Sequence, residues 1–344
     1  MSKKAPKNKR ILIFNVNWLG DVLFSTSALK ALRQAFPKAY IASILHPRTI
    51  EVLQDNPNLD EIIIFDEKEK NKHLLSKFSF VSALAKKNFD TVYLFHRSFT
   101  RSMLMALAKI PHRIGYKAKK RAGLFLTQKI ALPKGQIHRV DYFLNILRES
   151  GIDCKFSDYE FFVDNASREK IARMFEEEKV NKSDFFVCLN PGGNWNLKRW
   201  QKERFAQLAD RLTLEFKAKI IITGSAKDLS LAKDIASQIR EEPIITCGST
   251  SLKELGAIIE RSKLFISADS GPMHIAAALG VPIIALFGPT SAHITGPRGK
   301  GKIKIIQKDV GCCIPCYKVT CKDNRCMKTI SVEDCIAAVR EIIS

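Results

Sequence analysis

The chain has 344 residues, and 46% of them are apolar, which describes a globular protein and excludes a wholly disordered one. Its length favours two domains over a single core. Lysine and arginine number 56 against 35 acidic residues, and the resulting net charge of +21 predicts polyanionic partners, whether nucleic acid, anionic lipid headgroups or a phosphorylated glycolipid.

The N-terminus is basic but has no apolar segment before Ile11, so it does not resemble a signal peptide. No apolar run in the chain approaches the ~18–20 residues that cross a membrane. We therefore expect a cytoplasmic protein. Its nine cysteines are expected to be reduced thiols, because disulfide frameworks belong to secreted chains.

The first half of the chain alternates strands with helices. Strands are expected at 11–16, 40–45, 61–65 and 91–95, and helices at 22–36, 46–54, 68–87, 100–108 and 138–149. Between 113 and 134 the pattern becomes irregular, which predicts a surface loop. The alternation itself predicts a parallel sheet that is covered on both faces.

A second alternation follows a polar linker helix at 167–179. Strands are expected at 185–189, 219–223, 243–246, 264–267 and 281–287, and helices at 203–216, 228–240, 252–261 and 273–279. The chain is therefore predicted to form two doubly wound α/β domains. Ligands of such sheets bind at the carboxyl ends of the strands, and here we expect them in the cleft between the two halves.

Two common nucleotide-binding patterns are absent from the sequence. No GxGxxG follows the first strand and no GxxxxGK[ST] occurs, which argues against a dinucleotide oxidoreductase and a P-loop enzyme. A nucleic-acid-binding protein is a distant alternative. The charge favours it, but no helix-turn-helix, RNP or zinc-finger pattern is present.

The basic residues concentrate between Arg97 and Arg139, where there are eleven lysines or arginines and no acid. Apolar residues such as Phe99 and Leu124 are interspersed with them, a combination typical of membrane interfaces. We expect this segment to contact an anionic membrane surface or a phosphorylated glycolipid, although a basic surface also serves solubility. The residues chosen for this patch are Arg97, Arg101, Lys117, Lys119, Lys120 and Arg121.

Four turns that follow predicted strands carry residues suited to chemistry. Asp21 follows Gly20 at a strand-to-helix turn, where it is either a helix cap or a general base. The next two turns are rich in glycine and small residues, which let a ligand approach the backbone, and Lys198 adds positive charge. These two turns contribute Gly192, Gly193, Lys198, Gly224 and Ser225.

The fourth turn, at 269–274, belongs to a strand–helix–strand unit in which Pro272 suits a first helical turn. A helix N-terminus there offers free N–H groups and the positive end of the dipole, which suits a phosphorylated ligand. An ordinary parallel-sheet crossover has the same appearance. The candidate ligand-binding residues are Asp269, Ser270, Gly271 and His274.

A late cysteine cluster leaves a metal site open as a minor alternative. Cys313, Cys316, Cys321 and Cys326 include one Cys-x₂-Cys pair, which is half of a usual zinc site, but the remaining spacing is irregular. We expect thiols and no bound metal.

Three segments resemble one known family. LGDVLFSTSALKALRQAFPKAYI (19–41), NPGGNWNLKRWQKERFAQLADRL (190–212) and SADSGPMHIAAALGVPIIALFGPT (267–290) occur in the order found in the ADP-heptose:lipopolysaccharide heptosyltransferases, glycosyltransferase family 9. The resemblance runs nearly end to end. The Lys-Arg-Trp at 198–200 and the late cysteines are most similar to the heptosyltransferase II branch.

The resemblance implies a GT-B fold, with two Rossmann-like domains facing across a cleft. Residues 1–165 would bind the acceptor and residues 166–330 the nucleotide sugar, and in such folds a C-terminal helix, here 331–344, often crosses back to the first domain. It implies inverting transfer from ADP-L-glycero-D-manno-heptose to the lipopolysaccharide inner core, at the inner face of the inner membrane, without a cofactor or an essential metal.

By the same resemblance, Asp21 matches the catalytic aspartate and Lys198 the donor-phosphate lysine. Asp269, Ser270, Gly271 and His274 match the donor-binding block. Gly192 and Gly193 depart from the family pattern, and Asp228 falls near a donor-site glutamate in uncertain register. A GT-B enzyme with another nucleotide sugar or acceptor is therefore the main alternative.

Overall fold

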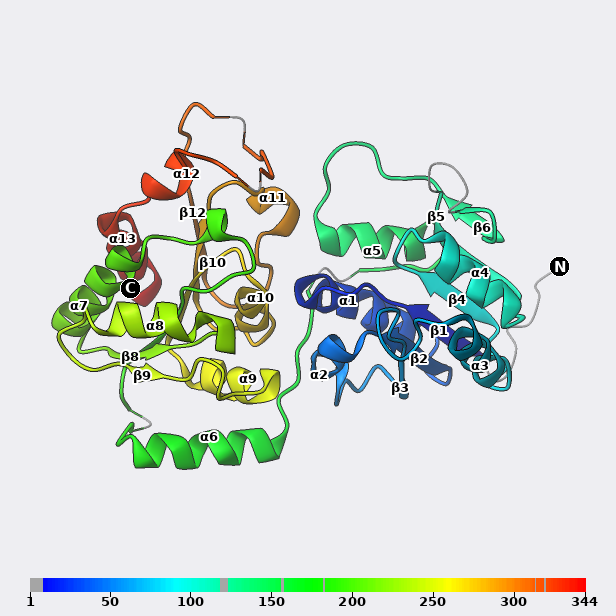
Figure 1. Ribbon diagram of the computed structural model, residues 1–344, viewed down its shortest axis with the longest axis horizontal. Coiled ribbons are helices and arrows are strands. Elements are labelled where there is room, and N and C mark those ends of the chain that lie inside the picture. Colours follow the sequence, from blue (N-terminus) through cyan, green and yellow to red (C-terminus); the bar gives the residue numbers. More distant parts are fainter. Residues whose placement is uncertain (1–8, 118–122, 156–157, 182, 313, 319) are drawn as a thin grey trace. The chain divides into compact units, whose positions relative to one another are not determined.

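The chain forms two compact units in a computed structural model, which describes residues 9–117, 123–155, 158–181, 183–312, 314–318 and 320–344. The first unit is Met1–Tyr159 and the second is Glu160–Ser344. Each contains one six-stranded parallel sheet between layers of helices (Figure 1). The two-domain α/β expectation is confirmed, and the architecture is that of the GT-B fold.

The sheet of the first unit has the order β3-β2-β1-β4-β5-β6. Its strands are β1 (Arg10–Phe14), β2 (Tyr40–Leu45), β3 (Glu61–Ile64), β4 (Thr91–Leu94), β5 (His112–Tyr116) and β6 (Gln128–Ile130). In register, Ile11 of β1 lies between Ile41 and Thr91. The chain order reverses between β1 and β4, which is the switch point at which such sheets bind ligands.

The helices of the first unit are α1 (Leu19–Ala35), α2 (Ile50–Leu53), α3 (Leu74–Ala85), α4 (Phe99–Leu107) and α5 (Arg139–Arg148), with a 3₁₀ turn at Pro47–Thr49. This turn and α2 together span most of the helix expected at 46–54. The loop expected at 113–134 was wrong in part, because β5 and β6 form there at the sheet edge. The first residue of β5 and the first two residues of β6 are exposed and polar, so the apolar pattern of these short strands is weak.

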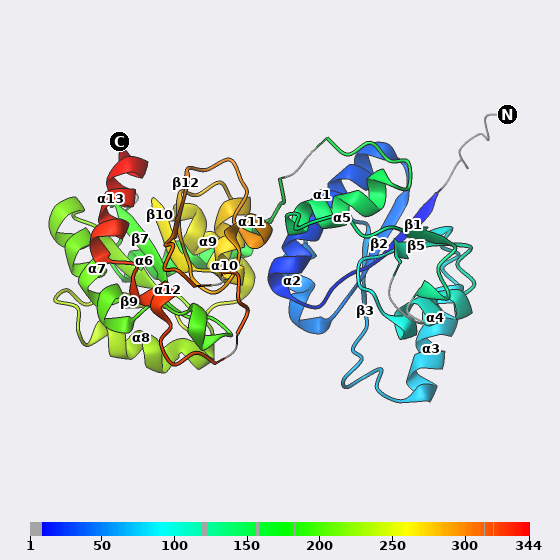
Figure 2. The ribbon, with the colours of Figure 1, turned by 90° about the horizontal axis from the view of Figure 1, so that it is seen from above.

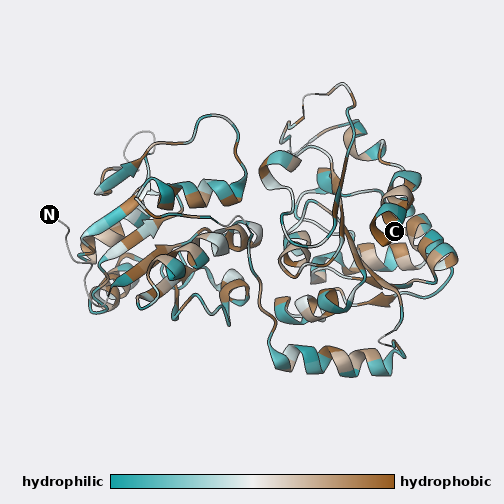
Figure 3. Ribbon diagram, turned by 180° about the vertical axis from the view of Figure 1, so that it is seen from behind, coloured by the Kyte–Doolittle hydropathy of each residue, from teal (hydrophilic) through white to brown (hydrophobic). Residues whose placement is uncertain are grey.

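The second unit repeats the same topology, with the order β12-β11-β10-β7-β8-β9. Its strands are β7 (Phe186–Asn190), β8 (Lys219–Ile222), β9 (Ile244–Ile245), β10 (Leu264–Ala268), β11 (Ile283–Phe287) and β12 (Ile303–Gln307). All residues of β10 and β11 are buried, as expected for parallel strands covered on both faces. Figure 3 shows brown, hydrophobic strands inside the second unit. Its switch point lies between β7 and β10.

The helices of the second unit are α6 (Asn165–Glu177), α7 (Lys202–Phe216), α8 (Leu229–Ala236), α9 (Leu252–Arg261), α10 (Gly271–Ala278), α11 (Ala292–Thr295), α12 (Arg325–Lys328) and α13 (Val332–Ile343), with 3₁₀ turns at Asn196–Lys198 and Ala226–Asp228. The C-terminal helix α13 packs against α7, β11 and β12 of its own unit (Figure 2). An ion pair of 2.7 Å between Arg340 and Glu215 joins it to α7.

Candidate functional site

Asp21 lies at the switch point of the first sheet, in the first turn of the helix that follows β1. Trp18 is the N-cap residue of α1, and its side chain does not cap the helix. The negative charge of Asp21 in the first turn therefore interacts favourably with the positive end of the helix dipole. Arg139, the first residue of α5, donates from Nε to Asp21 Oδ1 at 3.0 Å. The Asp21 side chain is still 22% exposed, so its carboxylate is both paired and accessible.

Asp21 and Arg139 line a cavity of about 280 Å³. The other residues around it are Val16, Trp18, Phe95, His96, Arg97 and Tyr142. Within the part of the chain that is described, no carboxylate pairs with Arg97, which is exposed. His96 is exposed at the edge of the cavity, but partial desolvation of its ring and then the charge of Arg101 lower its pKa, which favours the neutral ring. The cavity therefore joins one carboxylate to two arginines and a neutral imidazole.

Burial also raises the pKa of Tyr142, although Arg97 and Arg139 oppose the shift, so its phenol remains protonated. The Arg139 guanidinium lies over the Tyr142 ring at 4.7 Å and over Phe143 at 5.3 Å. Stacking fixes the plane of the arginine that holds Asp21. Sequence reasoning missed Arg139, because nothing in the pattern connects the start of α5 to the end of β1.

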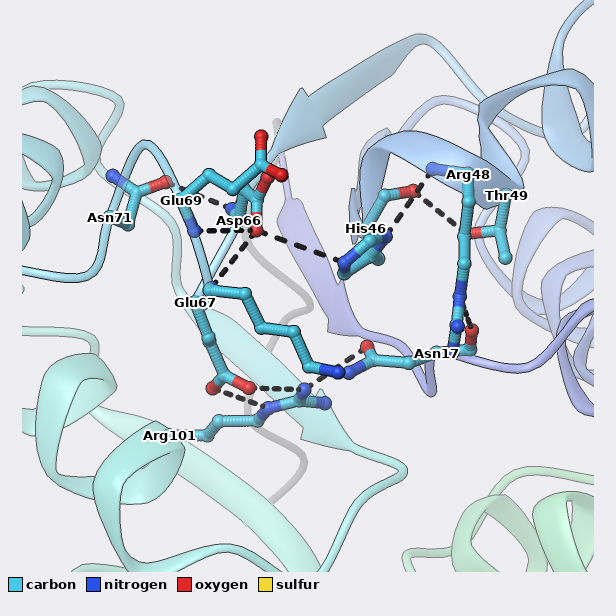
Figure 4. A network of polar contacts seen from close by, with 10 residues as sticks. Asn17, His46, Arg48, Thr49, Asp66, Glu67, Glu69, Asn71 and Arg101 are labelled. Carbon is cyan, nitrogen blue, oxygen red and sulfur yellow. Dashed lines mark hydrogen bonds and ion pairs between the residues drawn. The ribbon is translucent and has the colours of Figure 1, made fainter.

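Arg101 corrects the expected basic patch, because it is only 3% exposed. Its guanidinium donates to both carboxylate oxygens of Glu67, at 3.1 and 3.0 Å, and to Asn17 Oδ1 at 3.1 Å (Figure 4). It also donates to the Asn15 carbonyl at 2.8 Å. The Phe14 ring lies 4.8 Å below it. Arg101 thus braces the turn between β1 and α1 from inside the unit and cannot belong to a surface patch.

The rest of that expected patch is only partly described. Arg97 and Lys117 are exposed, whereas Lys119, Lys120 and Arg121 lie outside the described residues. A further arginine reaches the β1–α1 turn from the 3₁₀ turn after β2. Arg48 donates to the Asn17 carbonyl at 2.8 Å and stacks on the exposed Trp18 ring at 4.4 Å.

The second switch point contains a closed acid–cation pair. Asp269 follows β10 directly, and its Oδ2 accepts from Lys198 Nζ at 2.7 Å and from the Thr290 hydroxyl at 2.8 Å. The side chain of Asp269 is 7% exposed and that of Lys198 is 23% exposed. Thr290, which follows β11, was not chosen from the sequence, and only the adjacency of β10 and β11 explains its place here.

A cluster of small polar groups fills the space between β7 and β10. Asn190, the last residue of β7, donates to the Thr223 carbonyl at 3.1 Å and accepts from the hydroxyls of Ser267 and Ser270 at 3.3 Å each. The two serine hydroxyls are 2.8 Å apart. Ser270 is the N-cap residue of α10, but its side chain does not cap the helix. The first N–H groups of α10, which includes Gly271 and buried His274, therefore have no side-chain cap.

Asp228 organises the two glycine-containing turns beside this cluster. Its Oδ2 accepts from the Ser225 backbone at 3.0 Å and from the Ser225 hydroxyl at 2.6 Å, and its Oδ1 accepts from Arg199 at 3.1 Å. A Cβ on Gly192 would lie 2.5 Å from Asp228 Cγ, and one on Gly224 would lie 3.0 Å from Asp228 Cβ. Gly192 is thus required by packing, while a Cβ on Gly193 would meet open space.

Trp195 provides a donor next to this group. Its indole Nε1 is buried and has no acceptor among the described residues, and Lys198 Nζ lies 5.4 Å from its ring centre. A ligand that occupies this turn would meet the Lys198 ammonium and the uncapped N-terminus of α10, whereas the indole N–H of Trp195 is covered and becomes available only if a neighbouring side chain moves. The ammonium and the helix N-terminus can hold a phosphorylated compound.

The late cysteines do not assemble a metal site in the described part of the chain. Cys312 and Cys321 are exposed, Cys316 is half-buried and Cys326 is buried. No group of three or more histidine, cysteine or acidic side chains is placed to hold a metal ion among the residues described, and Cys313 lies outside them. In the same residues, no helix is long and apolar enough to cross a membrane.

Comparisons with known proteins identify the family of the chain. Residues 77–326 match the profile of Glycosyltransferase family 9 (heptosyltransferase). The chain is 28% identical over 340 residues to lipopolysaccharide heptosyltransferase 3 of Escherichia coli K12, covering 94% of this chain and 95% of that one. It is 25% identical over 300 residues to lipopolysaccharide heptosyltransferase 2 of the same strain, covering 84% and 85%. The crystal structure of a glycosyl transferase family 9 protein from Veillonella parvula superposes with a TM-score of 0.85 at 27% identity, covering 97% of both chains.

Proposed function

The chain belongs to glycosyltransferase family 9, the heptosyltransferases, and we propose that it transfers heptose from ADP-L-glycero-D-manno-heptose to the inner core of lipopolysaccharide. Relatives named heptosyltransferase 2 and heptosyltransferase 3 match it about equally well. The Lys-Arg-Trp at 198–200 and the late cysteines are our argument for a reaction of the heptosyltransferase II type. We place the reaction on the cytoplasmic side of the inner membrane.

One observation carries the proposal, namely that each sheet presents an acid–cation pair at its switch point. The Asp21 pair is accessible and lines a cavity, as a base that receives a substrate proton requires. The Asp269 pair is closed and adjoins an uncapped helix N-terminus, which suits a fixed diphosphate site. The acceptor would accordingly bind to the first unit and the donor to the second.

In the proposed reaction, Asp21 takes the proton of the acceptor hydroxyl while that oxygen bonds to C1 of the heptose. The bond between C1 and the diphosphate oxygen breaks, its electron pair leaves with ADP, and the configuration at C1 inverts. Arg139 keeps the Asp21 carboxylate aimed at the cavity through its 3.0 Å contact. A well-placed base typically contributes about 10²–10⁴-fold to such a step.

Negative charge develops on the departing diphosphate, and the second unit offers cations and donors to receive it. We assign this role to Lys198 and to the N–H groups at Ser270 and Gly271, so that the reaction needs no metal or cofactor. Gly192 and Gly193 would admit the phosphates close to the backbone. Gly224 and Ser225, which are held by Asp228, would lie along the nucleoside.

The acceptor proposal rests on charge. Arg97 and Arg139 line the cavity of Asp21, so an acceptor with phosphate or carboxylate groups near the reacting hydroxyl fits better than a neutral glycan. Lys117, with Lys119, Lys120 and Arg121 in the same segment of sequence, would extend this attraction. Asp269 and His274 act as supports in this scheme, because both are buried.

The test is ADP release from ADP-heptose in the presence and absence of a heptose-accepting lipopolysaccharide core. We expect release that depends on both substrates, together with an increase in thermal stability on adding ADP-heptose. A hundredfold excess over Kd raises the unfolding free energy by about 2.7 kcal/mol. If another nucleotide sugar stabilises the protein and ADP-heptose does not, the chain is a GT-B glycosyltransferase that uses that other donor. Salt-sensitive DNA binding without any response to sugar nucleotides would favour the nucleic-acid alternative.

A further inference from the structure

The first turns of α3 expose an unusual group of large apolar side chains. Leu74, Leu75 and Phe78 are 73, 84 and 60% exposed. Phe78 lies four residues after Leu74 and three after Leu75, so it adjoins each leucine on the helix surface. The second half of α3 is anchored instead, because Val81 and Leu84 are buried in the core of the first unit. The first turns of α3 are therefore held firmly, while their large apolar side chains stay exposed.

Uncompensated positive charge surrounds these turns. Lys68, Lys70 and Lys72 are exposed, and none of them has a carboxylate partner within the described part of the chain. Glu67 is already engaged by Arg101, which leaves Glu69 as the exposed acid of this loop.

The helix itself adds to this positive field. No side chain caps the N-terminus of α3 and no acid lies in its first turn, so the positive end of its dipole is not neutralised. Exposed leucines and unpaired lysines beside such an end suit a partner that is both apolar and anionic.

The geometry points to the surface of an anionic lipid bilayer as the partner of this α3 surface, which consists of Leu74, Leu75 and Phe78 with Lys68, Lys70 and Lys72. The three apolar side chains enter the boundary between headgroups and acyl chains, and the lysines contact the anionic headgroups. The apolar side chains or the lysines alone would bind a bilayer weakly, and the two contributions together give reversible attachment.

A second copy of the chain fits this surface less well. A stable protein interface takes about 800 Å² and 20–30 residues from each partner, far more than three side chains supply. Two copies would also bring their lysines together. A bilayer needs only a few inserted side chains and supplies the opposite charge.

This inference differs from the sequence expectation, which put membrane contact in the segment from Arg97 to Arg139. Arg101 of that segment is buried. The α3 surface was hidden in the sequence because 68–87 has the composition of a polar helix, and only the structure shows that its leucines point outward. The inference rests on surface chemistry alone and does not depend on the transfer reaction.

The experiment is co-sedimentation of the full chain with vesicles of phosphatidylcholine, with and without phosphatidylglycerol. We expect binding to the anionic vesicles that weakens as salt is raised. Leu75→Ser with Phe78→Ser should weaken binding at least tenfold. Lys70→Gln with Lys72→Gln should weaken it about 30-fold, since each lysine near an anionic surface contributes about fivefold. All four positions are exposed, so the variants should fold, and circular dichroism checks this.

Matched controls come from the second unit. Leu214→Ser removes a leucine that is 67% exposed, and Lys263→Gln with Lys300→Gln removes the same charge from other exposed positions. These variants should bind vesicles as the parent does. Equal loss in controls and α3 variants would reduce the effect to net charge and overturn the proposal. Unchanged binding of Leu75→Ser with Phe78→Ser would also overturn it, as would a concentration-dependent dimer that this variant abolishes.

Discussion

The two switch points of this chain contain the same chemical pair in two different states. Asp21 and Arg139 form an ion pair whose carboxylate is 22% exposed and faces a cavity of about 280 Å³. Asp269 and Lys198 form an ion pair whose carboxylate is 7% exposed and accepts a further hydrogen bond from Thr290. The Asp21 carboxylate can be reached by a substrate, whereas the Asp269 carboxylate is almost closed to solvent and two donors hold its Oδ2.

The difference shows that a carboxylate at a strand end does not reveal its role by position alone. Desolvation strengthens the Asp269 contacts and makes their loss costly, which suits a support. Partial exposure leaves Asp21 able to accept a proton without breaking a buried network. Substitutions can therefore separate the two pairs, the first through its effect on turnover and the second through its effect on stability.

The largest expected effect is that of Asp21→Asn on turnover. The amide keeps the size of the side chain and an oxygen for Arg139, but it cannot take a proton. We expect kcat to fall by about 10³-fold, within the range attributed to a general base. Steady-state ADP release measures kcat, and calorimetric titration with ADP should give an unchanged affinity. A variant that turns over at the parental rate would remove Asp21 from the mechanism.

Lys198→Met should have the next largest effect. The substitution removes the ammonium that we assign to the departing diphosphate while keeping much of the apolar stem. We expect kcat/KM for ADP-heptose to fall about 10²–10³-fold, comparable to losing one transition-state donor. Exposed Lys233 on the same unit, replaced by methionine, is the control. If the acceptor KM changes instead and the donor kinetics do not, our placing of the donor at the second switch point is wrong.

Asp269→Asn tests the opposite half of the comparison. The amide oxygen can still accept from Thr290, but the charge that balances Lys198 is lost in a buried place. We expect the free energy of unfolding to fall by about 1–3 kcal/mol, as for other buried polar groups deprived of a partner. Urea denaturation measures it. The loss in kcat should stay well below that of Asp21→Asn, and a larger loss would move the catalytic role to the second unit.

The sequence predicted the fold well because parallel strands are continuous apolar runs with clear turns. It predicted Asp21, Lys198 and Asp269 at strand ends for the same reason. It missed the partners Arg139 and Thr290, because strand adjacency and helix orientation, which spacing along the chain does not contain, bring them into contact. It misplaced Arg101 because a charge in a basic segment usually faces solvent, whereas here Glu67 and two asparagines satisfy it inside the unit. In each of these three cases, the position of the side chain depends on a residue that is distant in the sequence.

The smallest expected effect is that of Glu67→Gln, which removes the ion pair with Arg101 that supports the turn before Asp21. Burial disfavours the charged carboxylate, but the hydrogen bond and charge of Arg101 prevail and lower the pKa of Glu67. A carboxyl whose pKa is lower in the folded state stabilises the fold above its unfolded pKa, about 4.3, and this contribution disappears as the pH falls through the folded value.

At pH 7 the variant should therefore be less stable than the parent by about 1 kcal/mol, because the pair is partly exposed. The two should converge as the pH falls through the folded-state pKa of Glu67, and urea denaturation at pH 7 and at a series of acid pH values measures the difference. A difference in unfolding free energy that stays constant with pH would show that Glu67 supports Arg101 by packing and not by charge. Convergence at acid pH, together with a few-fold loss in kcat at pH 7, would show that the accessible position of Asp21 depends on the ion pair between Glu67 and Arg101.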